Sequence, residues 1–289
     1  MRAYPRVITL RNDCGWGYKR IAKKVELPAS TVHNWLQGRD TSTGSCSRPN
    51  LVLSPSLSYL AVAFVGDGGL IRSSSYHYEI RLAVKDLDFA KNFGSCISVV
   101  LGRNKLPRLN EIGFYVIRIW SRLLSDYLAN RREVQQLAEA YPAEFIRGFA
   151  DAEGSAVGSV DRNGVFASSV VMVNTDRELL DFVGHLLLSH YGIASTLTQE
   201  KRTHRMWGKL PCYYLTIRRH MDQRRFVESI GFGMARKQER LKIAVSLLGL
   251  RPRRAGVEWR KMFRKSGHRW IRRKPFGERV GAPGGTFSE

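Results

Sequence analysis

The sequence predicts an α+β protein in which an all-α N-terminal domain precedes two copies of an α-β-β-α-β-β-α repeat. Two kinds of pattern predict this class: apolar residues at helical spacing, and runs that alternate with period two. A third observation is that the order of these segments between residues 51 and 250 repeats once. We therefore divide the chain into a helical domain at 1–38, a linker at 39–50, repeats at 51–141 and 142–250, and a basic extension at 251–289.

The composition indicates a folded, strongly basic protein. The 289 residues are 43% hydrophobic and 10% aromatic, which excludes disorder of the whole chain. Lys and Arg number 47 against 25 Asp and Glu, a net charge of +22. Residues 1–50 carry +6 and residues 251–289 carry +9, so the two flanks hold most of the excess. This excess favours a nucleic-acid partner, since neutralising phosphates releases counterions. A merely soluble basic surface or a ribosome-associated protein is the alternative.

Other classes find no support in the sequence. The apolar run Tyr59–Val65 is far shorter than the roughly 18 residues that cross a bilayer. Arg2, Pro5 and Arg6 interrupt any signal-peptide apolar region. We therefore expect an intracellular, cytoplasmic protein with no membrane partner. The four cysteines are far apart and include no CxxC pair, which argues against a zinc site or a disulfide framework.

The first domain is expected to contain three short helices. Apolar residues near Val7 start the first helix, Tyr18–Val25 and Ala29–Leu36 form the others, and Glu26-Leu27-Pro28 makes the turn between them. The stretch GYKRIAKKVELPASTVHNWLQG resembles the helix-turn-helix family. That resemblance implies a second helix in the major groove, and the side chains expected to face outward from it are Ser30, Thr31, His33 and Asn34. A three-helix module that binds protein is the alternative.

The two repeats follow the same order of segments. The first is read as helix 55–65, strands to about 84, helix 87–101, strands to 120 and helix 121–140; the second as helix 142–150, strands to 173, helix 176–191, strands to 219 and helices from 221. Thr175 and Glu178 are spaced as a capping box, which predicts a helix start.

The first helix of each repeat ends in a distinctive way, in LAVAFVGDG (60–68) and IRGFADAEG (146–154). In the first helix we expect Leu57, Leu60, Ala61, Phe64 and Val65 to face the core. Small residues occupy the last turns, namely Ala63 and Gly66 in one helix and Gly148 and Ala152 in the other. Small side chains let two backbones approach closely, so the two helices are expected to pack against each other.

An acidic residue followed by glycine ends each helix, at Asp67-Gly68 and Glu153-Gly154. A carboxylate there faces the negative end of the helix dipole, at a cost of roughly 0.3–1 kcal/mol. Two such carboxylates side by side also repel, which raises a pKa unless cations intervene. Hard divalent cations relieve both costs. The alternative is that these acids merely form turns, but two at equivalent repeat positions favour the metal.

With these two motifs, residues 51–250 resemble a single-chain LAGLIDADG homing endonuclease. The resemblance implies pseudo-twofold-related repeats whose saddle-like antiparallel sheets lie along the DNA major groove. It also implies that Asp67 and Glu153 bind catalytic Mg²⁺, assisted by the carbonyls of Gly66 and Ala152, and that the two strands are cut with a stagger across the minor groove. The first copy departs from the family pattern with Gly66 in place of alanine, and the second with Glu in place of Asp.

The family also places basic or amide side chains near the metals. Matching the strand-to-helix junctions of the repeats pairs Lys85 with Asn174, and we nominate both as catalytic. Solvated surface positions are the alternative.

Alternation within the expected strands selects outward side chains that could contact DNA. They are Arg72, Ser74, Tyr76, His77, Glu79 and Arg81 in the first repeat, and Thr196, Thr198, Glu200, Arg202, Tyr214, Thr216 and Arg218 in the second. The strands at 155–160 and 165–173 are too apolar on both faces to orient. The tail at 251–289 is either a phosphate-clamping extension or a disordered segment with docked aromatic residues.

Taken together, these features predict a monomeric, Mg²⁺-dependent endonuclease that makes a staggered double-strand break at a specific DNA target. No intein splicing residues are evident, so a free-standing or intron-encoded enzyme is expected. Two alternatives stay open: a non-catalytic DNA-binding regulator on the same scaffold, and an RNA maturase that assists intron splicing.

Overall fold

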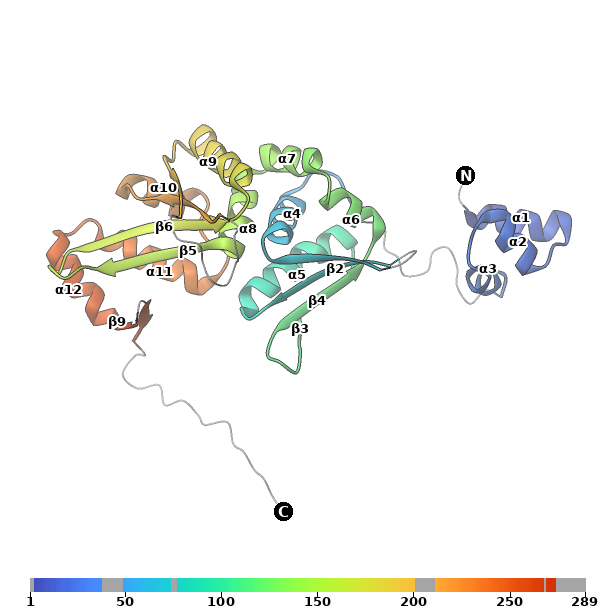
Figure 1. The fold of residues 1–289 in the computed structure, drawn as a ribbon, viewed down its shortest axis with the longest axis horizontal. Helices are drawn as coiled ribbons and strands as arrows, with labels where there is room; N and C mark the ends of the chain where they lie inside the picture. Colours follow the sequence, from blue (N-terminus) through green and yellow to red (C-terminus); the bar gives the residue numbers. More distant parts are fainter. Residues whose placement is uncertain (1–2, 38–48, 74–76, 201–210, 268, 274–289) are drawn as a thin grey trace, which may run out of the picture. The chain divides into compact units, whose positions relative to one another are not determined.

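The computed structural model describes residues 3–37, 49–73, 77–200, 211–267 and 269–273 (Figure 1). Contacts within the chain divide it into two units, Met1–Arg48 and Pro49–Glu289. None of the described helices is long and apolar enough to cross a membrane.

The N-terminal unit consists of α1 (Ala3–Cys14), α2 (Tyr18–Val25) and α3 (Ala29–Leu36). Its core is formed by Val7, Ile21, Ala22 and Val32, and the small side chain of Ala22 lies inside it. Glu26 adopts a left-handed conformation with φ 56° and ends α2. The amide of Leu27 then bonds the carbonyl of Ala22 at 3.0 Å, which closes the tight turn into α3.

The larger unit contains two halves with one element order. The first half consists of α4 (Pro55–Asp67), β1 (Gly68–Ser73), β2 (His77–Val84), α5 (Leu87–Leu101), β3 (Arg108–Leu109), β4 (Tyr115–Trp120), α6 (Arg122–Leu128) and α7 (Arg131–Ala140). The second consists of α8 (Pro142–Glu153), β5 (Gly154–Val160), β6 (Phe166–Asn174), α9 (Arg177–Tyr191), β7 (Thr196–Gln199), β8 (Tyr213–Ile217), α10 (His220–Ser229) and α11 (Ala235–Leu247). The antiparallel sheets have the orders β1-β2-β4-β3 and β5-β6-β8-β7. The predicted α+β class and its repeat are confirmed.

Four boundaries differ from the sequence-based expectation. Helices α4 and α8 include their terminal acids, because the amides of Gly68 and Gly154 still bond the carbonyls four residues back. The expected helix at 121–140 is two helices, since the Asn130 side chain accepts the Arg132 amide and starts a new one. The N-cap of α9 is Asp176 rather than Thr175, because its carboxylate accepts the Leu179 amide at 3.1 Å.

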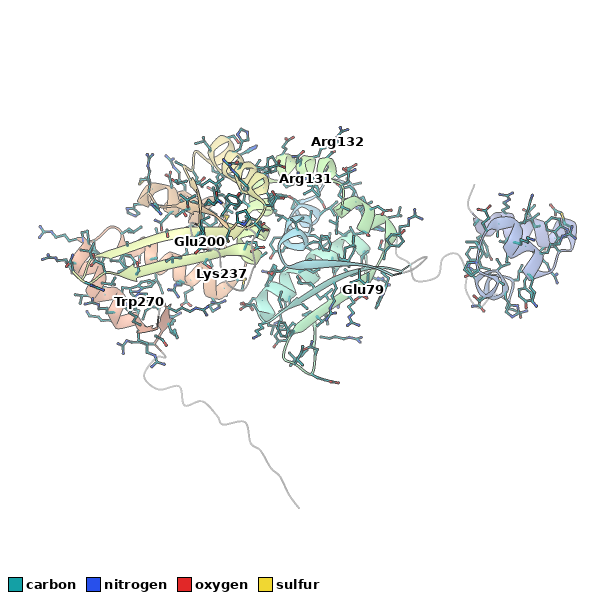
Figure 2. All side chains as sticks on the ribbon, viewed as in Figure 1. Glu79, Arg131, Arg132, Glu200, Lys237 and Trp270 are labelled. Atoms are coloured by element: carbon teal, nitrogen blue, oxygen red, sulfur yellow. The ribbon has the colours of Figure 1, made fainter. Side chains whose placement is uncertain are left out.

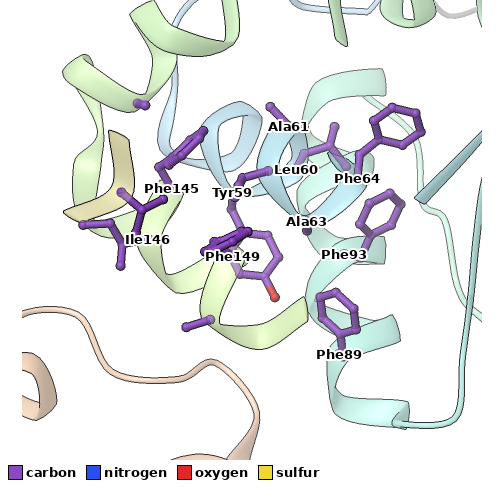
Figure 3. Packing of buried hydrophobic residues seen from close by; sticks show 14 of the residues in the cluster. Tyr59, Leu60, Ala61, Ala63, Phe64, Phe89, Phe93, Phe145, Ile146 and Phe149 are labelled. Carbon is purple, nitrogen blue, oxygen red and sulfur yellow. The ribbon is translucent and has the colours of Figure 1, made fainter. Parts of the chain in front are cut away.

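Helices α4 and α8 form the centre of the larger unit and make the most extensive contact between described elements (Figure 3). Gly148 permits this approach, since a Cβ there would lie 2.7 Å from the Tyr59 carbonyl oxygen. Apolar side chains of both helices, including Leu60 and Phe149, are fully buried around the crossing. Val65 departs from the expected core face and is 43% exposed. The close helix pair joins the two halves through one continuous core.

Two equivalent ion pairs also connect the halves. Arg131 at the start of α7 pairs with Asp176, the N-cap of α9, at 2.9 Å. Arg236 near the start of α11 pairs with Asp86, the N-cap of α5, at 3.2 Å. Each arginine therefore contacts the cap of the other half's helix, as a duplicated architecture requires. Both pairs are exposed, so each contributes about 0–1 kcal/mol.

The chain continues past the second half into α12 (Pro252–Met262), β9 (Phe263–Ser266) and β10 (Arg269–Arg272). Trp259 of α12 is fully buried, and a Cβ on Gly158 of β5 would lie 2.4 Å from its ring. The described residues 252–267 and 269–273 are therefore folded and packed on the second half, which is against a disordered tail there, whereas phosphate clamping stays a prediction. Residues 274–289 lie outside the described part.

Candidate functional site

The two predicted acids lie at adjoining helix ends. Asp67 is the last residue of α4, and Glu153 is the last residue of α8. A Cβ on Gly66 would lie 2.7 Å from the Ala152 Cβ and 3.4 Å from Glu153 Oε1. Glycine at position 66 therefore allows the last turns to meet, and it brings the Glu153 carboxylate beside the residue that precedes Asp67.

The electrostatic surroundings favour the neutral form of both acids. Burial between the helix ends and repulsion by Asp67 raise the pKa of Glu153 to about 7. Hydrogen bonding by Asn174 and the charge of Lys237 oppose this rise. Partial burial likewise raises the pKa of Asp67, again opposed by Lys237. The nearby positive charge of Lys237 is thus too small to keep both carboxyl groups at their ordinary pKa values.

Asn174, at the end of β6, reaches Glu153. Its Nδ2 donates to Glu153 Oε1 at 3.1 Å, while its Oδ1 accepts from the Asp176 amide at 2.8 Å. The second bond sets the orientation of the amide, so Asn174 presents its donor to the carboxylate. The nominated Asn174 thus lies in the site.

The expected pairing of Asn174 with Lys85 is wrong by one residue. In the strand register Leu82 lies opposite Gly68, as Met172 lies opposite Gly154, so Val84 is the counterpart of Asn174. β2 ends at Val84 and β6 ends at Asn174, and each strand end is followed two residues later by the N-cap of the next helix, so the expected match was shifted by one position. The Lys85 ammonium lies 5.3 Å from the centre of the Phe114 ring. Its catalytic role stays a prediction.

The structure adds a residue that the sequence analysis missed. Lys237 of α11 donates through Nζ to the carbonyls of Asp151 at 2.6 Å and Ala150 at 3.2 Å, in the last turn of α8 (Figure 2). Burial lowers the pKa of Lys237, whereas the charges of Asp151 and Asp67 raise it. No motif marks this lysine, because it lies 86 positions after Asp151 in a chain with many basic residues.

A buried network holds α11 in place. Asp151 is 2% exposed and accepts hydrogen bonds from the Tyr59 hydroxyl at 2.7 Å and from the amides of Gly233 and Met234. These amides precede α11, so Asp151 caps the helix that carries Lys237. Burial raises the pKa of Asp151 despite these bonds. The first motif has Val65 at the corresponding position, and this connection is made only in the second half.

The donor set fits a hard divalent cation. Two carboxylates at one point, each with a raised pKa, gain most from a cation that accepts oxygen ligands. Among the described residues no third His, Cys, Asp or Glu joins them. The remaining ligands would therefore be backbone carbonyls, water or a phosphate. The expected ligand carbonyls of Gly66 and Ala152 lie in the same helix turns, and their role stays a prediction.

The outer face of the first sheet, opposite the core, is charged. The register aligns Glu79 and Arg81 of β2 with Trp120 and Arg118 of β4, whereas Ile80 and Leu82 on the other face are buried. Glu79 pairs with Arg118 at 3.3 Å. The two strand residues Glu79 and Arg81 thus face outward as expected.

The remaining first-repeat candidates are placed less fully. The backbone of Arg72 lies opposite Tyr78 in the strand register, and its side chain lies outside the described part. His77 starts β2 and pairs with Ser73. Ser74 and Tyr76 lie outside the described residues.

The outer face of the second sheet is rich in hydroxyl groups. Thr196 and Thr198 of β7 lie beside Thr216 and Tyr214 of β8, in the order that alternation predicted. Thr216 is only 7% exposed, however, because it lies in an inner strand between Val171 and Thr196. Tyr214 donates to Glu200 at 3.0 Å. Arg218 is exposed just after β8, and Arg202 lies outside the described residues. The register also orients the strands that the sequence left open, with Ser155, Val157, Ser159 and Ser169 on this outer face.

In the N-terminal unit, the candidate residues of α3 differ in exposure. Ser30 is exposed, and Thr31 and Asn34 are half-buried. The His33 ring packs edge-on against Tyr18 with the ring centres 4.8 Å apart. His33 therefore contacts α2, and it is less available than the sequence indicated.

Comparisons with known proteins agree with this architecture. A family model described as a LAGLIDADG-like domain matches residues 140–231, which include the second motif and its sheet. This match confirms the LAGLIDADG resemblance over the second repeat. The uncharacterized protein MJ0398 of Methanocaldococcus jannaschii is 28% identical over 248 residues, covering 78% of this chain and 87% of that protein.

Solved structures with a similar fold include proteins studied as homing endonucleases. I-DmoI in complex with DNA and Mn is 23% identical, with a TM-score of 0.46 over 62% of this chain and 97% of that one. A mutant of I-SmaMI is 14% identical, with a TM-score of 0.47 over 72% and 97%. The homing endonuclease I-WcaI, bound to its DNA recognition sequence, is 14% identical, with a TM-score of 0.43 over 65% and 87%.

Proposed function

We propose that this chain is a site-specific DNA endonuclease that hydrolyses both strands of its target in the presence of Mg²⁺ and leaves a staggered break. The supporting observation is the meeting of Asp67 and Glu153 at the ends of α4 and α8, between two sheets of equal topology. Each carboxylate comes from one half. A duplicated site of this kind matches the two strands of a duplex, which a two-fold axis also relates.

The residues of the site have separate roles in this proposal. Asp67 and Glu153 hold the divalent cation, which when bound can lower the pKa of a water nucleophile and stabilise the leaving oxygen. Asn174 orients Glu153, and its hydrogen bond favours the ionised carboxylate. Lys237 adds positive charge from the side of α11 and fixes the last turn of α8. From the resemblance of the two motifs, we also assign metal binding to the carbonyls of Gly66 and Ala152. We assign a phosphate contact to Lys85 from the same resemblance.

Recognition is assigned to the outer faces of the sheets and to α3. Mixed Arg, Glu, Thr and Tyr side chains suit base edges in the major groove, where hydrogen-bond patterns differ for every base pair. We assign this role to the outward positions of β2, β7 and β8, with α3 of the helix-turn-helix unit extending the contacted sequence. In this proposal the enzyme is a monomer, because one chain supplies both halves of the site. It acts inside the cell, where its DNA target lies.

Cleavage selection tests this proposal. The protein is incubated with a library of random duplexes and Mg²⁺, and the cut ends are sequenced. We expect one long target with breaks offset between the strands. Asp67→Asn and Glu153→Gln should each reduce cleavage by at least about 100-fold, while the Kd for the target stays within a few-fold in Ca²⁺.

Other outcomes would point to the alternatives. Unchanged cutting by both variants would show that these acids do not hold the metal. Tight duplex binding without cutting in any divalent metal would favour a regulator, and splicing of a structured intron RNA without DNA cleavage would favour a maturase.

A further inference from the structure

We propose that the C-terminal module, α12 with the β9–β10 hairpin (residues 252–273), binds the phosphate backbone of duplex DNA beside the half of the target contacted by the second sheet. This inference rests on the proposed function and adds a contact surface to it. The family match ends at residue 231, so the module lies outside the matched domain.

The module presents a dense cationic surface. All its basic side chains that the structure describes are exposed: Arg253, Arg254, Arg260, Lys261, Arg264, Lys265, Arg269, Arg272 and Arg273. The acidic residue Glu258 pairs with Lys261 at 2.8 Å. A shallow hollow in this surface is lined by Val257, Arg260, Lys261 and Arg273. Within the described part of the chain, Arg264 and Lys265 make no ion pair, so their charges are available to a polyanion.

The adjoining sheet lacks such charge. Among the described residues of β5, β6, β7 and β8, the outward positions carry hydroxyl or apolar side chains and no charged ones. The first sheet, by contrast, presents Glu79, Arg81 and Arg118 outward. Hydroxyl and apolar groups can read base edges, but they neutralise no phosphate. The described outward positions of these strands therefore supply no cation, and the C-terminal module is attached to this half.

The module is fixed rather than loosely tethered. The Trp259 ring stacks on Phe263 with centres 3.9 Å apart, and both side chains are buried against Val160 and Phe166. Arg240 of α11 donates to the Trp270 carbonyl at 2.7 Å, which ties the hairpin to the second half (Figure 2). Arg272 also pairs with Glu239 of α11. Because the backbone of the module is anchored, binding a phosphate array costs the ordering of side chains but not of the segment that carries them.

The position of the module suits a contact around the sheet edge. Its helix α12 packs on β5 and β6, and β5 is the edge strand of the second sheet. In Figure 1, β9 lies beyond β5 on the side away from β6. A DNA backbone that leaves the outer face at this edge would meet the hairpin without crossing the sheet.

The experiment compares Arg264→Gln/Lys265→Gln with the control Lys91→Gln/Arg132→Gln in the full-length protein. The control removes two exposed cations from α5 and α7 and so matches the change in net charge. Binding to the selected target duplex is measured from 50 to 300 mM salt in Ca²⁺, and hydroxyl-radical footprints are recorded. We expect the test variant to lower the slope of log Kd against log salt by up to about 1.8, since each phosphate contact contributes about 0.9. Its footprint should shorten only beyond the half-site of the second repeat.

The outcomes separate this inference from the proposed function. Equal slopes and footprints for the two double variants would overturn the module's role, even if both variants cut normally. A selective loss of affinity for RNA hairpins, with duplex binding intact, would overturn it as well. Failure of the wild-type protein to cut any duplex would instead count against the endonuclease, while the slopes, measured then on a duplex of arbitrary sequence, would still decide the module.

Discussion

The side-chain amide of Asn174 donates a hydrogen bond to Glu153, whereas the apolar Val84 holds the corresponding position in the half that carries Asp67. The two acids are therefore equivalent in the backbone but not in their surroundings. Glu153 has a hydrogen-bond partner that favours its charged form. Lys237, which belongs to the second half, donates to the last turn of the helix that carries Glu153. The two strands of a duplex would thus meet chemically different carboxylates.

Removing the amide partner should affect Glu153 selectively. We expect Asn174→Ala to raise the pKa of Glu153 further, because a hydrogen bond to a carboxylate contributes about 1.5–3 kcal/mol in favour of the charged form. The pH at half-maximal cleavage should move upward by about one unit, measured on duplexes labelled on each strand. Thr175→Ala, at the next position, is the control. An unshifted pH profile for Asn174→Ala would exclude this role.

The raised pKa of Glu153 also predicts how stability depends on pH. Its value rises from 4.5 to about 7 on folding, so the folded protein holds the proton more tightly than the unfolded chain does. Without divalent metal, stability contributed by this group should therefore fall as pH rises from about 4.5 to about 7, and then level off.

Glu153→Gln removes the ionisable group and with it the fall in stability between about pH 4.5 and pH 7. At pH 8 without metal, the variant should therefore have a higher Tm than the wild type. A gain of about 1 kcal/mol would appear as roughly 2–4 °C. The difference should vanish near pH 4, where both forms are neutral, and Mg²⁺ should raise the Tm of the wild type more than that of the variant. Thermal unfolding in EDTA and in Mg²⁺ measures both effects. A variant less stable than the wild type at pH 8 contradicts the assignment.

Lys237 should act through charge as well as through its hydrogen bonds to α8. Lys237→Met removes the positive charge that lowers the pKa values of Asp67 and Glu153, so we expect cleavage to fall about 10- to 100-fold at neutral pH and to recover partly at pH 9. Lys242→Met changes an exposed lysine of the same helix and is the control. A purely structural role would lower cleavage equally at every pH.

The crossing of α4 and α8 should tolerate no added side chain at Gly148. An alanine Cβ would lie 2.7 Å from the Tyr59 carbonyl oxygen and 2.9 Å from Val62 Cγ1, so the helices must separate. We expect Gly148→Ala to lower the free energy of unfolding by about 1–3 kcal/mol in urea titrations. Gly249→Ala is the control, since its nearest neighbour atom would lie 3.8 Å away. A loss below 0.5 kcal/mol would mean that the contact can relax.

Much of the architecture could be predicted from local patterns. The duplicated order of segments and the acid-glycine ends at Asp67 and Glu153 depend on periodicity and on a repeated motif, both of which are visible in a single sequence. Strand alternation correctly assigned the outward faces of β2 and β8. The pairing of Lys85 with Asn174 failed by one residue, because the sequence alone does not show where each strand ends or which residues of neighbouring strands lie opposite each other.

What the sequence determined by itself was therefore the fold class, the repeat and the two acids, because helix and strand periods and small-residue motifs act over short distances along the chain. Only the tertiary structure decided that Lys237 reaches the end of α8, that Val84 rather than Lys85 corresponds to Asn174, and that the C-terminal module packs on β5. These contacts join residues far apart in the chain, and close packing of the helices and sheets determines which of them meet.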